Sequence, residues 1–167
     1  MKSDILIIED EAEIREILCE IIGDAGFHVE AVPSAIEALE RLKDIENIPP
    51  LLLCDISMPK MSGLEFVKKL REAGTPVAIV MLTAHHDKDK IIEALQLGAL
   101  DYVVKPFRPP ELLERIAGWL EFGRRMRKLQ ADAAGNGEGL TPAHHLRMLE
   151  LFRLQNHKKT KESGEAA

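Results

Sequence analysis

Short apolar segments alternate with longer amphipathic ones along the chain, and this alternation restricts the fold more than any other feature. The segments LLLC and VAIVML are apolar at every position, which is typical of strands that are covered on both faces. Between them, isoleucines and leucines recur with the spacing of a single helix face, as they do from Ile14 to Ile22. Strands and helices that alternate in this way predict a parallel sheet between two layers of helices.

Five strand–helix pairs follow one another in residues 1–123. Glycine and proline residues mark the ends of the segments, which makes the order of the elements readable. The predicted strands are Ile5–Ile8, Phe27–Val32, Leu51–Cys54, Val77–Leu82 and Asp101–Val104, and the predicted helices are Ala12–Asp24, Ala35–Asp44, Leu64–Glu72, Lys88–Leu97 and a fifth from Pro110 onward. The fold class is therefore α/β, with a five-stranded parallel sheet flanked by five helices.

The balance of charge changes sign near Gly123. Residues 1–123 carry 13 Lys and Arg against 23 Asp and Glu, whereas residues 124–167 carry 9 against 5. This shift predicts one domain over 1–123 and a helical extension over 124–167. In the extension, the fifth helix is expected to continue through RRMRKLQADAA. The segment GNGEG is expected to form a flexible break. A second helix is expected to begin at Thr141-Pro142, and the end, HKKTKESGEAA, is expected to be disordered.

The second helix of the extension carries an apolar stripe that includes Leu146, Leu149 and Phe152. A short isolated helix is only marginally stable in water. We therefore expect the apolar stripe to pack on residues 1–123 or on a second chain. No apolar run approaches the ~20 residues of a membrane span, and the acidic start is unlike a signal peptide. The two cysteines lack a metal-binding spacing. These features predict a cytoplasmic protein.

Polar residues follow the predicted strands at the edge where ligands bind in open α/β sheets. Clustered carboxylates repel one another unless a cation lies among them, and carboxylate oxygens suit Mg²⁺. A carboxylate beside the metal can then attack phosphorus, while an amine and a hydroxyl contact the phosphoryl oxygens. The residues concerned are Glu9, Asp10 and Glu11 after the first strand, Asp55 after the third, Thr83 after the fourth and Lys105 after the fifth.

Each of these residues also has a simpler interpretation. Asp10 and Asp55 could cap a helix or a turn, Thr83 could be an ordinary hydroxyl at a strand end, and Lys105 could be a surface cation. The order of all of them on alternating elements favours a Mg²⁺-dependent phosphoryl site. In that interpretation Asp55 ends a buried strand because the rigid strand aims it at the reacting phosphorus.

The motifs ILIIEDE, LLLCDISMPKMSG, VMLTAH and LGALDYVVKPF, which span about residues 3–123, resemble the receiver domain of bacterial two-component response regulators. The resemblance implies a flavodoxin-like sheet of order 2-1-3-4-5, like that of the chemotaxis regulator. It also implies a phosphorylation-dependent signalling switch that is not a turnover enzyme. A sensor histidine kinase would supply the phosphoryl group.

The resemblance also assigns roles to single residues. Asp55 matches the phosphoacceptor. Asp10 matches a direct Mg²⁺ ligand, Glu9 an acid that acts through water, and Ser57 the residue that lends the metal its backbone carbonyl.

On the phosphoryl side, Thr83 and Lys105 match the groups that bind phosphoryl oxygens. Tyr102 matches the aromatic residue that turns inward when Thr83 moves toward the phosphate. A cis peptide bond is expected before Pro106.

The output is less defined by the sequence. The resemblance implies that the protein signals to a downstream protein through the face formed by the fourth helix, the fifth strand and the fifth helix. Self-association is a further possibility, either through that face or through the C-terminal helix. Alternatives are an unphosphorylated pseudo-receiver that binds proteins and a truncated DNA-binding regulator, because LTPAHHLRMLEL resembles the first helix of some helix-turn-helix outputs. Too few residues follow for a recognition helix, so nucleic-acid binding is not favoured. A metal phosphatase is disfavoured because Ser57 stands where its second acid would be.

Overall fold

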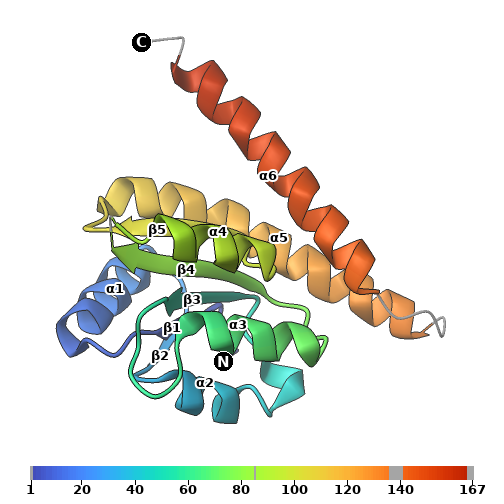
Figure 1. Ribbon diagram of the computed structural model, residues 1–167, viewed down its shortest axis with the longest axis horizontal. Helices are drawn as coiled ribbons and strands as arrows, with labels where there is room; N and C mark the ends of the chain where they lie inside the picture. The colour runs from blue at the N-terminus through green and yellow to red at the C-terminus, as the bar shows by residue number, and fades with distance from the viewer. Residues whose placement is uncertain (1, 85, 136–140, 165–167) are drawn as a thin grey trace.

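The computed structural model describes residues 2–84, 86–135 and 141–164 and shows one parallel sheet between helices (Figure 1). The strand order is β2-β1-β3-β4-β5, which confirms the predicted fold class and topology. The strands are β1 (Ile5–Ile8), β2 (Val29–Val32), β3 (Leu51–Asp55), β4 (Ala78–Ala84) and β5 (Asp101–Lys105). The helices are α1 (Ala12–Asp24), α2 (Ala35–Arg41), α3 (Gly63–Glu72), α4 (Lys88–Gln96), α5 (Pro109–Gly135) and α6 (Pro142–Gly164), with a 3-10 turn at Ile45–Asn47.

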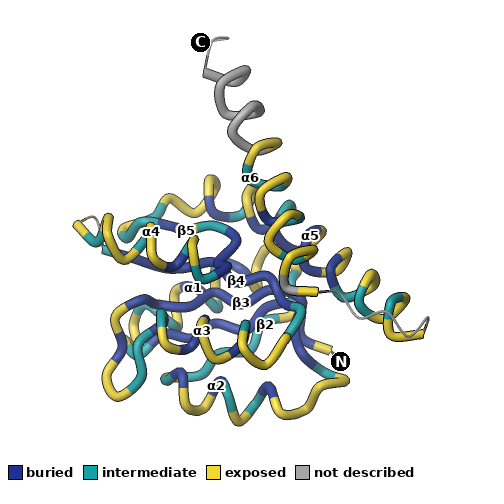
Figure 2. Tube along the Cα trace, turned by 45° about the vertical axis from the view of Figure 1, so that its right-hand side comes forward, coloured by how far each residue is buried: buried dark blue, intermediate teal, exposed yellow. Residues whose placement is uncertain are grey.

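Successive residues of the central strands enter opposite halves of the core. In β1, Ile5 and Ile7 pack with α1 and α5, whereas Leu6 and Ile8 pack with α2, α3 and α4. Strand side chains point alternately to the two faces of a sheet, so an uninterrupted apolar strand has a partner layer on each side. The burial in Figure 2 follows this arrangement, with the central strands buried along their length.

The register of the parallel strands brings their carboxyl ends to one edge. Asp55 pairs with Leu82, Thr83 pairs with Val104, and Ala84 pairs with Lys105. Each of the strands β3, β4 and β5 runs one or two residues further than the sequence predicts, so Asp55, Thr83 and Lys105 belong to the strands themselves. Their backbones are therefore fixed by the hydrogen bonds of the sheet.

The loop after β3 is held close to the strand by the start of α3. Ser62 caps this helix in a capping box with Glu65, and the N–H of Gly63 donates to the carbonyl of Ile56 at 2.8 Å. A Cβ atom on Gly63 would overlap the carbonyl oxygen of Asp55 and lie 2.9 Å from the Cα of Ile56. Only glycine fits there without moving the end of β3.

Helix α5 crosses the predicted boundary at Gly123 without a break. Phe122, Gly123 and Met126 are buried, and a Cβ atom on Gly123 would overlap the carbonyl oxygen of Pro50. The packing of α5 on the sheet thus continues past Gly123, while the division into two domains stays a prediction. The peptide bond between Lys105 and Pro106 is cis, as expected.

Helix α6 packs on the same chain. Leu149 is fully buried and joins the core cluster that contains α5, and the ring centroids of Phe152 and Phe122 lie 4.9 Å apart. Leu146, by contrast, is 48% exposed. The helix continues to Gly164, through most of the segment for which the sequence predicts disorder. Residues 136–140, which hold most of the predicted break, and 165–167 lie outside the described residues.

Within the residues that the structure describes, none of the helices combines the length and apolar character needed to cross a membrane.

Candidate functional site

Three carboxylates converge where β1 and β3 end. One oxygen each of Glu9, Asp10 and Asp55 lies within 4.8 Å of the others. Glu9 and Asp55 are buried. Burial raises the pKa of the Asp55 carboxyl above its ordinary value, and burial together with the charge of Asp55 raises the pKa of Glu9. The cluster is thus a place where negative charge is costly unless a cation is close.

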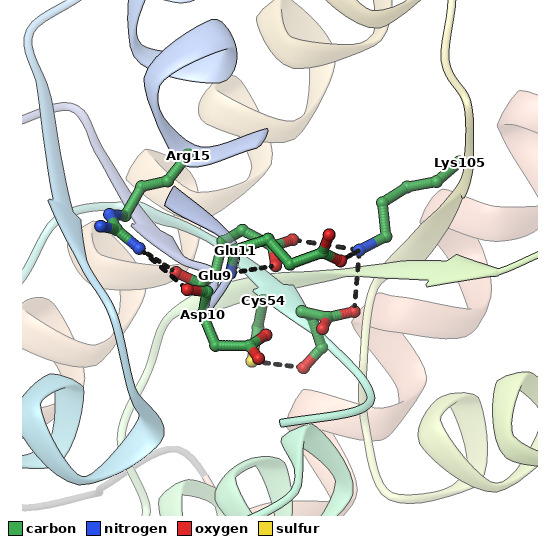
Figure 3. Close-up of polar contacts among 7 residues, drawn as sticks. Glu9, Asp10, Glu11, Arg15, Cys54 and Lys105 are labelled. Atoms are coloured by element: carbon green, nitrogen blue, oxygen red, sulfur yellow. Dashed lines mark hydrogen bonds and ion pairs between the residues drawn. The ribbon is translucent and has the colours of Figure 1, made fainter. Parts of the chain in front are cut away.

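Lys105 reaches this cluster from the end of β5 (Figure 3). Its Nζ lies 3.1 Å from Oε2 of Glu9, 3.3 Å from Oδ1 of Asp55 and 3.9 Å from Oε1 of Glu11. Burial opposes the charge of the ammonium group, but the attraction of Asp55 and Glu9 prevails and raises the pKa of Lys105. The amine is therefore a fixed cation beside Asp55.

Arg15 approaches the acids from the opposite side, on α1 (Figure 3). Its Nη1 donates to the backbone carbonyls of Glu9 at 2.8 Å and Asp10 at 3.3 Å, while the N–H of Glu11 donates to Oε1 of Glu9 at 3.2 Å. These bonds fix the loop that carries the acids. Arg15 was not among the residues that the sequence singled out. The available signal was its place one helical turn after Glu11.

The donor set fits a hard divalent cation such as Mg²⁺. The buried Oδ1 of Asp10 has no hydrogen-bond partner among the described residues, and a buried polar atom of this kind requires an explanation. Lys105 balances part of the charge of the three acids, and Arg15 binds carbonyls instead of carboxylates. Carboxylate oxygens and water are the ligands that Mg²⁺ prefers, so Asp10, Asp55 and Glu9 could hold it.

The remaining residues predicted for the site lie around this centre. Thr83 is buried at the end of β4, and its hydroxyl donates to the carbonyl of Ala84 at 3.2 Å. Tyr102 is 37% exposed on β5. Ser57 is exposed, and its hydroxyl accepts from Nζ of Lys90 at 3.2 Å. The structure thus brings the three acids and Lys105 into one cluster. Thr83 follows Leu82, the strand partner of Asp55, Ser57 lies two residues after Asp55, and Tyr102 lies three residues before Lys105 on β5.

A buried carboxylate, a neighbouring ammonium group and a cluster of acids that could hold a divalent cation are the groups that a phosphoryl transfer uses. Such a transfer depends mainly on positioning and on neutralisation of charge, which these residues supply.

The sequence profile of the response regulator receiver domain matches residues 5–117. The chain therefore belongs to the family of two-component response regulators and carries their receiver domain.

Relatives with known names agree with this membership. The chain is 37% identical over 149 residues to the phosphate regulon transcriptional regulatory protein PhoB of Klebsiella pneumoniae, covering 87% of this chain and 63% of PhoB. It is 41% identical over 112 residues to the two-component response regulator PhoP of Pseudomonas aeruginosa, covering 67% of this chain and 49% of PhoP. The chain thus matches 63% of the length of PhoB and 49% of the length of PhoP, so it spans only part of these curated relatives.

Among solved structures, a response regulator receiver domain protein from Clostridium thermocellum is similar with a TM-score of 0.68 and 27% identity, covering 74% of this chain and 98% of that one. This similarity confirms the flavodoxin-like receiver fold.

Proposed function

We propose that this chain is a phosphorylation-dependent switch that accepts a phosphoryl group from a sensor histidine kinase onto Asp55. The observation that carries the proposal is the position of Asp55 at the end of a buried strand, with Nζ of Lys105 at 3.3 Å and with Glu9 and Asp10 beside it. Asp10, Asp55 and the backbone carbonyl of Ser57 would hold Mg²⁺, and Glu9 would act through water.

In the proposed transfer, a carboxylate oxygen of Asp55 attacks the phosphorus of a phosphohistidine. An O–P bond forms, the P–N bond breaks, and the electron pair of that bond leaves with the imidazole. Bound Mg²⁺ would neutralise charge on the phosphoryl oxygens, and Lys105 contacts them from the other side. Arg15 holds the loop that positions Glu9 and Asp10, and so acts through them.

The hydroxyl of Thr83 would then exchange its bond with the carbonyl of Ala84 for one with a phosphoryl oxygen. This movement would vacate space beside β4, into which Tyr102 turns from its exposed position. The face of α4, β5 and α5 would change as a result. We propose that a downstream protein binds this face. We further propose that the protein is cytoplasmic and that it acts through its own phosphorylation, without turning over an external substrate.

A second candidate is the receiver part of a transcriptional regulator. The relatives PhoB and PhoP are named as regulators and are longer than the matched region. In that case the whole protein would bind DNA. It would also associate with itself, through the α4-β5-α5 face or through α6.

The direct test is phosphorylation by a small donor. Incubation with acetyl phosphate and Mg²⁺ should add one phosphoryl group to the wild-type protein, as measured by intact mass, and chelation of Mg²⁺ should prevent it. Asp55→Asn should add none. Equal labelling of wild type and Asp55→Asn would refute the assignment of the phosphoacceptor.

A further inference from the structure

Helix α6 binds the receiver through one face of its first half. Leu149 is 0% exposed, Phe152 packs on Phe122 of α5, and Met148 packs against the same cluster. On the opposite side of the helix, Leu151 is 52% exposed. One apolar face is thus buried, as in a helix bound in a groove.

Arg153 of α6 extends this interface with polar contacts. Its guanidinium donates to the carbonyls of Leu95 at 3.1 Å and Leu100 at 3.3 Å, and also to that of Ala99. Leu95 lies in the last turn of α4, and the other two residues connect α4 to β5. Arg153 thus binds three backbone acceptors in the α4–β5 connection, of which the carbonyl of Leu95 also accepts from the N–H of Gly98 at 3.2 Å.

The α4–β5 connection leads from α4, the helix that follows the strand with Thr83, into β5, the strand that ends with Lys105. Strand β4 ends with Thr83 and Ala84 and leads toward α4, while β5 carries Tyr102 and ends with Lys105. Residues Ile92 and Leu95 of α4 line a shallow groove together with Leu146 and Arg153 of α6. Helix α6 therefore holds α4 and β5 at the ends opposite to the acid cluster. Figure 2 shows α6 lying against this part of the molecule.

We propose that α6 is an intramolecular clamp on the α4–β5 connection and that its docking and phosphoryl binding at Asp55 oppose each other. This inference rests on the proposed function. The docked helix occurs together with an exposed Tyr102 and with the Thr83 hydroxyl bonded to Ala84. A shift of β4, α4 and β5 toward a phosphoryl group would displace the three carbonyls that Arg153 binds. The displaced helix would then expose Leu149 and Phe152.

Thermodynamic linkage makes the proposal reciprocal. If phosphoryl binding weakens docking of α6 by some factor, then the docked state binds the phosphoryl group more weakly than the undocked state by the same factor, and a variant that undocks α6 gains affinity up to that factor. Couplings of this kind are commonly about fivefold or larger. The proposal therefore predicts effects at both ends of the molecule.

The first experiment measures hydrogen exchange of residues 143–153 in the full chain, with and without beryllofluoride and Mg²⁺ as the phosphoryl analogue. Exchange in this segment should increase on addition of beryllofluoride in the wild type and stay unchanged in Asp55→Asn. Unchanged exchange in 143–153, while segments around Asp55 and Thr83 show that the analogue is bound, would overturn the clamp and leave the proposed function intact. If no segment responds in the wild type, the proposed function fails and the clamp falls with it.

The second experiment measures the affinity for beryllofluoride in matched pairs of variants. Leu149→Ala and Arg153→Gln should bind it about fivefold more tightly than the wild type, or better. Leu151→Ala and Arg147→Gln alter exposed side chains of the same helix and should leave the affinity unchanged. Arg153→Gln removes no core side chain, so it tests the clamp even if Leu149→Ala folds poorly. Equal affinities of Arg153→Gln and Arg147→Gln would contradict the proposal.

Discussion

At the scale of single residues, the position of Asp55 depends on a glycine eight residues later. A methyl group at Gly63 would overlap the backbone of Asp55 and Ile56, and backbone atoms cannot move aside as a flexible side chain does. We predict that Gly63→Ala lowers the free energy of unfolding by about 1–3 kcal/mol and reduces phosphorylation. Gly23→Ala in α1, where a Cβ atom meets nothing within 4 Å, is the control and should be neutral or stabilising by up to ~1 kcal/mol.

Denaturant unfolding followed by the fluorescence of Trp119, the single tryptophan, compares the two variants. Equal stabilities would show that the end of β3 can shift freely, contrary to the packing seen here.

Lys105 contacts the acids, and its proposed role concerns the phosphoryl group and not the metal. We therefore predict that Lys105→Ala still binds Mg²⁺, because the amine is no metal ligand, but accepts a phosphoryl group from acetyl phosphate at least about tenfold more slowly. Isothermal titration calorimetry measures the affinity for Mg²⁺, and intact mass spectrometry measures the rate of phosphorylation. A collapse of Mg²⁺ affinity in Lys105→Ala would mean that the lysine holds the acid cluster together.

Residues at strand ends were predictable, whereas residues that act through the backbone were not. Asp55 and Lys105 stand directly after apolar segments, so their convergence follows from the parallel sheet. Arg15 binds the backbone carbonyls of Glu9 and Asp10. Because every residue type has such a carbonyl, the sequence does not show which residues Arg15 binds. The direction of the Thr83 hydroxyl depends on a single rotamer and was likewise beyond the sequence.

At the scale of elements, α5 is fixed on the sheet by a close backbone approach. Gly123 lies against the carbonyl of Pro50, and buried Trp119 donates its indole N–H to Asp101 at 3.0 Å. We predict that Gly123→Ala destabilises the fold by about 1–3 kcal/mol, because α5 must move away from the sheet.

Gly118 lies on the same helix with nothing within 4 Å of a Cβ atom. Gly118→Ala should therefore stabilise the helix slightly. Thermal unfolding of the two variants distinguishes the positions. If Gly123→Ala is as stable as Gly118→Ala, the contact of α5 with Pro50 does not anchor the helix.

The order and type of the helices and strands could be predicted from the periodicity of apolar residues in the sequence. Their full lengths could not be predicted in this way. A charge shift suggested a boundary at Gly123, but α5 passes this position because Phe122 and Met126 are still covered by the core, and the helix ends only at Gly135. The apolar stripe of α6 was visible in the sequence. Its docking site was not, because Leu149 and Phe152 would suit any apolar surface, and the three carbonyls that Arg153 binds carry no sequence signal.

At the scale of the whole molecule, docking of α6 should depend on pH through His145. Burial, and then the nearby charge of Arg71, lower the pKa of this imidazole to about 4 in the docked state, against an ordinary value near 6.5. Because the docked state binds the proton less tightly, the contribution of neutral His145 to docking is fully present above pH 6.5 and is lost as the pH falls toward 4. We predict that the docking equilibrium weakens about tenfold between pH 7.5 and 5.5.

Protection factors of residues 143–153 from hydrogen exchange measure this effect. His145→Gln should remove the pH dependence, and His144→Gln, which changes an exposed neighbour, should retain it. An imidazole of His145 that titrates near 6.5 by NMR would show that the helix does not bury this side chain.

The proposed function of the whole molecule depends on phosphorylation of Asp55. The most direct measurement treats the protein with acetyl phosphate and Mg²⁺, reduces the acyl phosphate with borohydride, which converts a phosphorylated aspartate to homoserine, and locates the product by peptide mass spectrometry. We predict homoserine at position 55, and none when Mg²⁺ is chelated. Homoserine at another position, or its absence from position 55 in protein that carries a phosphoryl group, would contradict the account.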